Sequence, residues 1–258
     1  MKLESSRSEE GKTNTPAKVA LVTGAAKRVG ADIVRVLHAA GFAIALHYRG
    51  SLAEAKALKD ELENIRVDSV ALFQSDLNQL SGIADLVTQV LSHFGRLDAL
   101  VNNASSFYPT PIGEISVAQI QDLFASNAFA PLLLAQAAAP ALRQAEGAIV
   151  NIVDIYADRP LPRYAPYCMA KAALVAATYA LARELGPEVR VNGIAPGNII
   201  WSNNMEKAET PQIVLERTAL KRQGGPMDIA ATVKFLLMDA PYITGQILRV
   251  DGGRWLFI

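Results

Sequence analysis

Three residues in the second half of the chain have types and spacing suited to moving a proton. Tyr167 and Lys171 stand four residues apart, and Asp154 precedes Tyr167 by thirteen residues. A phenol has a pKa of about 10, which makes it a poor proton donor and acceptor at neutral pH. On a helix, Lys171 lies on the same face as Tyr167, where its charge lowers the pKa of the phenol. The spacing predicts a catalytic tyrosine assisted by a lysine.

Asp154 adds a carboxyl group to this pair. Burial raises the pKa of a carboxyl group, so a buried aspartic acid can hold and deliver a proton near neutral pH. We expect Asp154 and Tyr167 to act as a coupled acid pair that titrates jointly, with Lys171 offsetting the negative charge. The structural alternative is that Asp154 caps the segment after it or pairs with Arg159.

A glycine-bearing turn near the amino terminus predicts a phosphate-binding site. Gly24 permits a tight turn after an apolar run, and Gly30 allows close packing where an amphipathic segment at residues 31–40 begins. Backbone N–H groups at such a helix start point at a pyrophosphate. Arg28 and Val29 lie in this turn, and Arg28 contacts either the phosphate alone or both the phosphate and the substrate.

The second apolar run ends in His47, Tyr48, Arg49, Gly50 and Ser51. Proteins that prefer NAD usually carry an acidic residue here, which accepts a hydrogen bond from the ribose 2′-hydroxyl. Arg49 can instead bind a 2′-phosphate and Ser51 can donate to it, so the sequence predicts NADP as the cofactor. The alternative is a solvated surface arginine.

Polar residues also follow the next two apolar runs. We expect Asp76 and Leu77 to contact the adenine ring, and Asn102, Asn103 and Ala104 to form the floor beneath the ribose and nicotinamide. Each group alone is typical of a turn. Their succession at predicted strand ends favours a ligand site.

Seven apolar, β-branched runs alternate with helical patterns. They lie at residues 19–23, 43–48, 69–74, 99–102, 148–153, 189–194 and 247–250. Continuous apolar runs indicate strands covered on both faces, and intervening helices indicate right-handed parallel crossovers. The sequence therefore predicts an α/β fold, a Rossmann-type doubly wound seven-stranded parallel sheet with helices on both faces, in a single domain over residues 17–258. We expect residues 1–16 to be a disordered polar tail.

Composition excludes several classes of partner. Lys plus Arg and Asp plus Glu number 25 each in 258 residues, so no net charge recruits nucleic acid or a membrane surface. The most apolar stretch, residues 128–142, is shorter than the roughly 20 residues that cross a bilayer. A single Cys168 fits a reducing compartment, and the histidines lack ligand spacing, so we expect a cytoplasmic protein without a metal.

Two long segments rich in alanine and leucine, residues 116–145 and 164–186, predict helices. Small side chains allow close helix packing, either between subunits or within one chain. Residues 197–225 are the least regular region, and they form either a binding loop or an ordinary connection.

Together these residues resemble the short-chain dehydrogenase/reductase family over residues 18–253. The resemblance rests on the glycine turn, Asn102-Asn103-Ala104, Asn127, Tyr167 with Lys171, Pro196-Gly197 and the closing Val250-Asp251-Gly252-Gly253. It implies that Tyr167 relays the proton, that Lys171 binds the cofactor ribose and that Asn127 helps to hold a water-mediated proton path. It also implies that Gly197 lies in the cofactor site and that the protein is a homotetramer.

Departures from the usual family pattern resemble the pteridine reductase branch. Arg28 replaces the middle glycine of the turn, Asp154 replaces a serine, Ala104-Ser105-Ser106-Phe107 replaces an alanine–glycine continuation, and the pair His47-Tyr48 accompanies them. The resemblance implies NADPH-dependent reduction of a dihydropterin to the tetrahydro form, with oxidised pterin and dihydrofolate as further candidates. A pterin is flat and can stack on Phe107. We expect Arg28, Ser105, Asp154 and Tyr167 to complete the substrate site.

Three other functions stay open. A dihydromonapterin reductase shares the chemistry and differs in the side chain at pterin C6, which residues 201–205 would read. A carbonyl or 3-oxoacyl-thioester reductase of the same family is disfavoured by Asp154 in place of serine. A non-catalytic NADP-sensing protein has no need of Tyr167 and Lys171 together.

Overall fold

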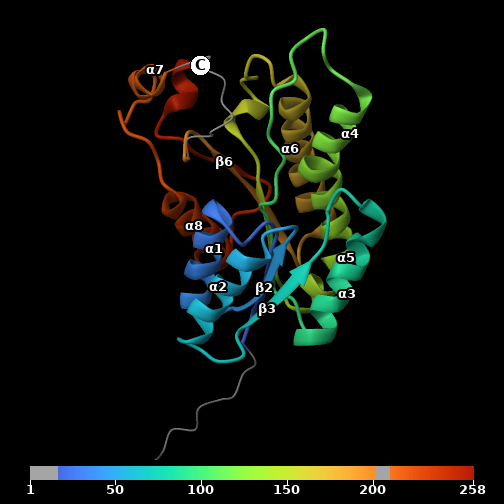
Figure 1. Ribbon diagram of the computed structural model, residues 1–258. Coiled ribbons are helices and arrows are strands. Elements are labelled where there is room, and N and C mark those ends of the chain that lie inside the picture. The colour runs from blue at the N-terminus through green and yellow to red at the C-terminus, as the bar shows by residue number, and fades with distance from the viewer. Residues whose placement is uncertain (1–16, 201–209) are drawn as a thin grey trace, which may run out of the picture.

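The computed structural model describes residues 17–200 and 210–258 (Figure 1). The predicted tail, residues 1–16, and the segment expected to read pterin C6, residues 201–205, lie outside the described residues.

Seven strands form one parallel sheet in the order β3-β2-β1-β4-β5-β6-β7. They are β1 (Val19–Val22), β2 (Ala43–Tyr48), β3 (Val70–Gln74), β4 (Ala99–Asn102), β5 (Ala148–Ile152), β6 (Arg190–Pro196) and β7 (Ile247–Val250). The strand order reverses between β1 and β4, and sheets of this type bind ligands beyond the carboxyl ends of the strands at that point. The predicted Rossmann-type fold is confirmed.

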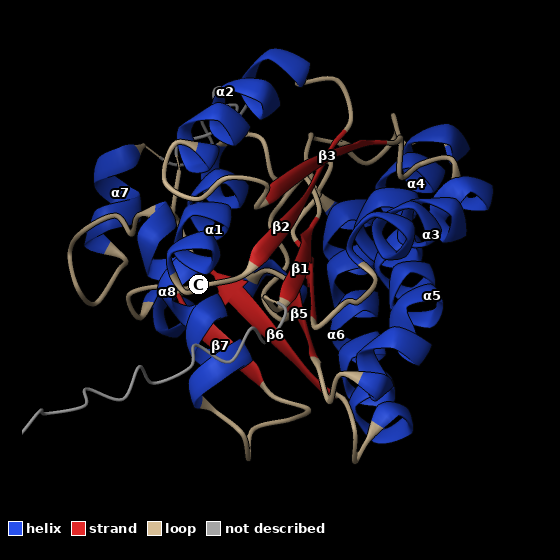
Figure 2. Cartoon of the chain, turned by 90° about the horizontal axis from the view of Figure 1, so that it is seen from below, coloured by secondary structure: helices blue, strands red, loops and turns tan. Residues whose placement is uncertain are grey.

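Helices cover both faces of the sheet, with α1, α2 and α8 on one side and α3, α5 and α6 on the other (Figure 2). The α-helices are α1 (Arg28–Ala39), α2 (Leu52–Glu63), α3 (Ile83–Phe94), α4 (Val117–Phe124), α5 (Ala130–Gln144), α6 (Ala165–Leu185), α7 (Pro211–Glu216) and α8 (Pro226–Lys234). Shorter turns are η1 (Leu80–Gly82), η2 (Ala125–Phe129), η3 (Ile155–Ala157), η4 (Phe235–Asp239) and η5 (Arg254–Phe257).

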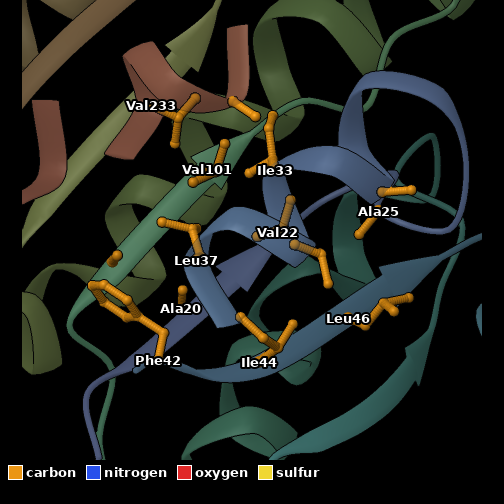
Figure 3. Close-up of a cluster of buried hydrophobic side chains, with 14 of the residues drawn as sticks. Ala20, Val22, Ala25, Ile33, Leu37, Phe42, Ile44, Leu46, Val101 and Val233 are labelled. Atoms are coloured by element: carbon orange, nitrogen blue, oxygen red, sulfur yellow. The ribbon is translucent and has the colours of Figure 1, made fainter. Parts of the chain in front are cut away.

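The buried side chains form one large cluster on each face of the sheet. Figure 3 shows part of the cluster under α1 and α8, where Val22 and Ile44 of the sheet meet Ile33 and Leu37 of α1 and Val233 of α8. Burying a side chain of this size stabilises a fold by about 1.5–3 kcal/mol. Because both faces of the central strands are covered, their sequences are continuously apolar rather than alternating.

The segment expected to be one helix over residues 116–145 contains a break. Ser116 begins α4 with a capping box shared with Gln119, and the π-helical turn η2 separates α4 from α5. Pro131, in the first turn of α5, has no amide hydrogen to donate to the carbonyl group of Asn127 four residues earlier. Single π turns of this kind are frequent at functional sites, and this one carries Asn127.

Residues 117–144 and α6 have the length and apolar composition of membrane-spanning helices. In the structure they pack into the layer that covers the sheet, and 61% and 44% of their most apolar windows are buried. Large apolar side chains on the outer faces of these helices are exposed, namely Phe129, Leu132, Met169 and Tyr179.

Candidate active site

A cavity of about 730 Å³ lies at the carboxyl ends of the strands. Most residues predicted to bind the cofactor line it: Gly24, Arg28, Val29, Gly30, His47, Tyr48, Arg49, Ser51, Asp76, Leu77, Ala104 and Gly197. Ser105, predicted to contact the substrate, lines it as well. The lining also includes Lys27, which lies in the glycine turn, and Ser126, Ile199 and Ile200, which no local sequence signal selects.

The glycine turn provides a cradle that only a bare backbone can form. A Cβ atom on Gly30 would lie 2.4 Å from the carbonyl oxygen of Gly24, and a Cβ atom on Gly24 would lie 2.9 Å from Cα of Ala104. The first N–H groups of α1 have no acceptor within the helix and open toward this cavity. The turn therefore fits the pyrophosphate of a dinucleotide.

Arg28 has a left-handed backbone with a φ of 52°. This conformation costs a residue with a side chain roughly 1–2 kcal/mol, and glycine adopts it freely. The side chain of Arg28 is exposed at the cavity. It has no carboxylate partner among the residues that the structure describes. A cation is thus presented to the cavity at a site where backbone geometry favours glycine.

His47 holds the glycine turn in place. Its Nδ1 atom accepts a hydrogen bond from the backbone N–H of Gly24 at 3.2 Å, and its Nε2 atom donates to the carbonyl oxygen of Ser75 at 3.1 Å. The side chain is buried, which lowers the pKa of the imidazole from 6.5 to about 4. His47 therefore stays neutral, and its ring supports the wall of the cavity.

Asn102 and Asn103 have separate roles. Asn102 is buried away from the cavity, where its Nδ2 atom donates to Oδ1 of Asn151 at 2.8 Å. Asn103 lines the cavity, and its side chain donates to the carbonyl oxygens of Thr23 and Gly24 at 2.9 and 3.1 Å. Asn103 thus fixes the glycine turn, and Asn102 ties β4 to β5.

Arg49 and Ser51 follow β2 at the far end of the cavity. The guanidinium group of Arg49 is exposed and has no carboxylate partner in the described part of the chain. Asp76 accepts a hydrogen bond from the backbone N–H of Asn78 at 3.0 Å, and Leu77 is buried beside it. This end of the cavity offers a cation, a hydroxyl group and an apolar wall.

The predicted acid pair is in direct contact. The hydroxyl group of Tyr167, on α6, donates to Oδ2 of Asp154 at 2.6 Å. Asp154 follows β5, and its Oδ1 atom accepts from the backbone N–H of Tyr156 at 2.9 Å, so Asp154 also caps η3. Capping by Asp154 and its contact with Tyr167 were alternative predictions from the sequence. In the structure Asp154 makes both contacts. Arg159 lies over Trp255 instead of pairing with Asp154.

Lys171 completes this group from the next turn of α6. Its Nζ atom donates to the carbonyl oxygen of Ile152 at 2.8 Å and lies 5.8 Å from the ring centroid of Tyr167. Burial lowers the pKa of Lys171 to about 8, against the opposing effect of the Asp154 charge.

The expectation that Lys171 lowers the pKa of Tyr167 is wrong for this structure. Burial and the neighbouring charge of Asp154 raise the pKa of Tyr167 well above 10. Burial also raises the pKa of Asp154, more than its hydrogen bonds and the charge of Lys171 lower it. Both groups therefore hold their protons more tightly than they would in water, and Asp154 is the stronger acid of the two.

Asn127 is hydrogen-bonded to the loop that forms part of the cavity wall. Its Nδ2 atom donates to the carbonyl oxygens of Leu123 and Ser106, each at 2.9 Å, and its Oδ1 atom accepts from the hydroxyl group of Ser105 at 2.7 Å. Ser105 lines the cavity, whereas Asn127 is fully buried. The π turn thus places an amide group directly behind the cavity wall.

Phe107 lies between the loop after β4 and α6. Its ring stacks on Tyr164 at a centroid distance of 4.5 Å and meets the ring of Tyr167 edge-on at 4.8 Å. One face of Phe107 is therefore already covered by protein. Like Asp154 and Lys171, Phe107 lies outside the lining of the large cavity.

Comparison with known proteins agrees with this geometry. Residues 24–254 match the family model described as Enoyl-(Acyl carrier protein) reductase. Pteridine reductase 1 of Leishmania tarentolae is 37% identical, over 93% of this chain and 97% of its own length. A 3-oxoacyl-(acyl-carrier-protein) reductase of Staphylococcus epidermidis is 35% identical, over 93% and 99% respectively. An uncharacterized oxidoreductase of Methylorubrum extorquens is 35% identical, over 92% and 97%.

The chain belongs to the short-chain dehydrogenase/reductase family. It is an oxidoreductase. Its glycine turn and most of its strand-end residues line the cavity, and Tyr167 and Lys171 lie on α6.

Proposed function

We propose that this protein is an NADPH-dependent pteridine reductase, which reduces a dihydropterin to the tetrahydro form. The observation that carries the proposal is the 2.6 Å hydrogen bond from the hydroxyl group of Tyr167 to the carboxyl group of Asp154. Asp154 thus places a carboxyl group where most short-chain dehydrogenases/reductases carry a serine.

Reduction of a C=N bond requires a hydride at carbon and a proton at nitrogen. A bound nicotinamide supplies the hydride. Asp154, with its raised pKa, holds a proton for the nitrogen, and the hydroxyl group of Tyr167 is placed to return one to the carboxylate. Lys171 offsets the charge left on the pair. A serine can only donate a neutral hydrogen bond, which suits a carbonyl oxygen better.

The cavity supports NADP as the cofactor. The glycine turn would hold the pyrophosphate, and Arg49 with Ser51 would hold the 2′-phosphate. Arg28 would contact a phosphate and the polar edge of the pterin. The face of Phe107 opposite Tyr164 and the hydroxyl group of Ser105 would complete the substrate site.

A substrate panel tests the proposal. NADPH oxidation is measured with dihydrobiopterin, dihydromonapterin, dihydrofolate and an acetoacetyl thioester. We expect rapid turnover of a dihydropterin and almost none of the thioester. Asp154→Ala should lower pterin turnover by roughly 100-fold, with NADPH binding retained, and Asp85→Asn on the exposed face of α3 is the control. Full pterin turnover by Asp154→Ala contradicts the proposal.

A second candidate is a 3-oxoacyl-thioester reductase, favoured by relatives of that name with 35% identity. The same panel separates the two, because this enzyme would oxidise NADPH with the thioester and leave pterins unchanged. If the thioester alone reacts, Asp154 acts in that reaction and the pterin assignment fails.

We also propose a cytoplasmic homotetramer without nucleic-acid or membrane partners. Exposed apolar side chains are suited to contact with a second copy of the chain, namely those of Phe129 on η2, Leu132 on α5, and Met169 and Tyr179 on α6. Light scattering coupled to size-exclusion chromatography measures the subunit number, and a monomeric mass contradicts this part of the proposal.

A further inference from the structure

We propose that Trp255 is a positioning residue that holds the turn carrying Asp154 in its working orientation; this rests on the proposed role of Asp154. Two guanidinium groups lie over the indole ring of Trp255, that of Arg159 at 4.5 Å and that of Arg249 at 4.1 Å from the ring centroid. Arg159 ends the turn that Asp154 begins, whereas Arg249 belongs to β7, so the ring joins the turn to the sheet.

The turn after β5 is short and internally bonded. Asp154 caps it at one end, and the backbone N–H groups of Asp158 and Arg159 donate to the carbonyl oxygen of Ile155, each at 3.2 Å. A displacement of Arg159 is therefore transmitted to the cap. The side chains of Asp158 and Arg249 add a second tie to β7, an ion pair of 2.9 Å.

Trp255 also has anchors outside this turn. Its backbone N–H donates to Oδ2 of Asp251 at 2.8 Å, and its neighbour Arg254, which is buried, donates to the carbonyl oxygen of Val214 in α7 at 3.3 Å. Figure 1 shows the C-terminus beside α7. The ring also packs against the buried cluster that contains Val153 and Ile155. Trp255 thus gives the turn a rigid support.

The ring face, rather than the indole N–H, makes these contacts. The Nε1 atom of Trp255 is buried without a hydrogen-bond partner in the described parts of the chain. Cation–π attraction acts through the face of any aromatic ring. A phenylalanine at this position should therefore keep the support, while an alanine should remove it.

The test compares kcat with cofactor affinity. With dihydrobiopterin as substrate, we expect Trp255→Ala to lower kcat by about tenfold while the Kd for NADPH changes less than about twofold. Trp255→Phe should recover most of the lost kcat. Leu256→Ala, at an exposed neighbour in the same turn, is the matched control and should behave as the unaltered protein.

Arg159→Ala keeps the test decisive if Trp255→Ala does not fold, because Arg159 is exposed and its removal leaves the buried cluster intact. We expect the same loss of kcat. Unchanged kcat in Arg159→Ala and in a folded Trp255→Ala, or a loss in Trp255→Phe equal to that in Trp255→Ala, overturns the inference. Asp154→Asn is assayed alongside: if it is fully active, the proposed function fails, and if it alone is inactive, only the role of Trp255 fails.

Discussion

The carboxyl group of Asp154 is held by both of its oxygens, with Oδ2 accepting from the hydroxyl group of Tyr167 at 2.6 Å and Oδ1 accepting from the backbone N–H of Tyr156 at 2.9 Å. One contact links it to α6, and the other links it to its own turn. The orientation of the carboxyl group is therefore set by two elements that are fixed separately.

The raised pKa of Asp154 predicts how turnover depends on pH. If the protonated carboxyl group is the proton donor, as proposed, kcat for a dihydropterin should be highest at low pH and should fall as the pH rises through the raised pKa of Asp154. In Asp154→Asn the residual rate should lack this step. Steady-state rates across the pH range check the prediction, and an unaltered step in the variant contradicts it.

The same shift affects stability. Since the folded protein holds this proton more tightly than the unfolded chain, the stability it contributes is present below the ordinary carboxyl pKa of about 4 and is lost as the pH rises through the folded value. The melting temperature of Asp154→Asn should fall less over that pH interval than the melting temperature of the parent protein. Parallel melting curves would argue against a buried, protonated carboxyl group.

His47 should titrate far below an ordinary histidine. Its folded pKa of about 4 lies below the usual 6.5, so the stability linked to its neutral ring is present above pH 6.5 and is lost as the pH falls toward 4. The full loss is on the order of 3 kcal/mol. Ring resonances followed by NMR give the value directly. A midpoint near 6.5 would mean that the imidazole does not hold Gly24 as described.

Arg49 should set the choice of cofactor. Removing a guanidinium that binds a phosphate should weaken NADPH binding by roughly 10- to 100-fold. Binding of NADH, which lacks the 2′-phosphate, should hardly change in Arg49→Ala. Fluorescence titration with both cofactors measures the two affinities, and Arg183→Ala, at an exposed position on α6, is the matched control. Equal losses for both cofactors would refute the assignment.

Gly30 should not tolerate even a methyl group. In Gly30→Ala the new Cβ atom would meet the Gly24 carbonyl oxygen at 2.4 Å and Cα of Ala25 at 2.9 Å, so the phosphate turn must move. We expect lower cofactor affinity and a loss of stability of about 1–3 kcal/mol. Gly82→Ala, where nothing lies within 4 Å, is the control. Calorimetry and NADPH titration distinguish the two variants.

The fold could be predicted because its information is local. Most strands are largely apolar runs, and the phosphate turn follows β1 directly in the sequence. The helical pattern of residues 116–145 did not predict the break at η2, because the break depends on Pro131 as well as on residue periodicity.

The site was predictable only where residues cluster along the chain. The raised pKa of Tyr167 depends on burial by distant elements, which spacing alone does not show. The contact between Arg159 and Trp255 joins residues 96 positions apart, and neither belongs to a motif. Ile199 and Ile200 reach the cavity through the path of the chain after β6.

The positive φ of Arg28 has a cost that is independent of any ligand. Arg28→Gly would release that strain and would raise the free energy of unfolding by up to about 1 kcal/mol. The same change would remove a positive charge from the cavity. If Arg28 binds the ligand as proposed, thermal stability and ligand affinity oppose each other at this position, and variants selected for thermal stability alone would bind the ligand more weakly.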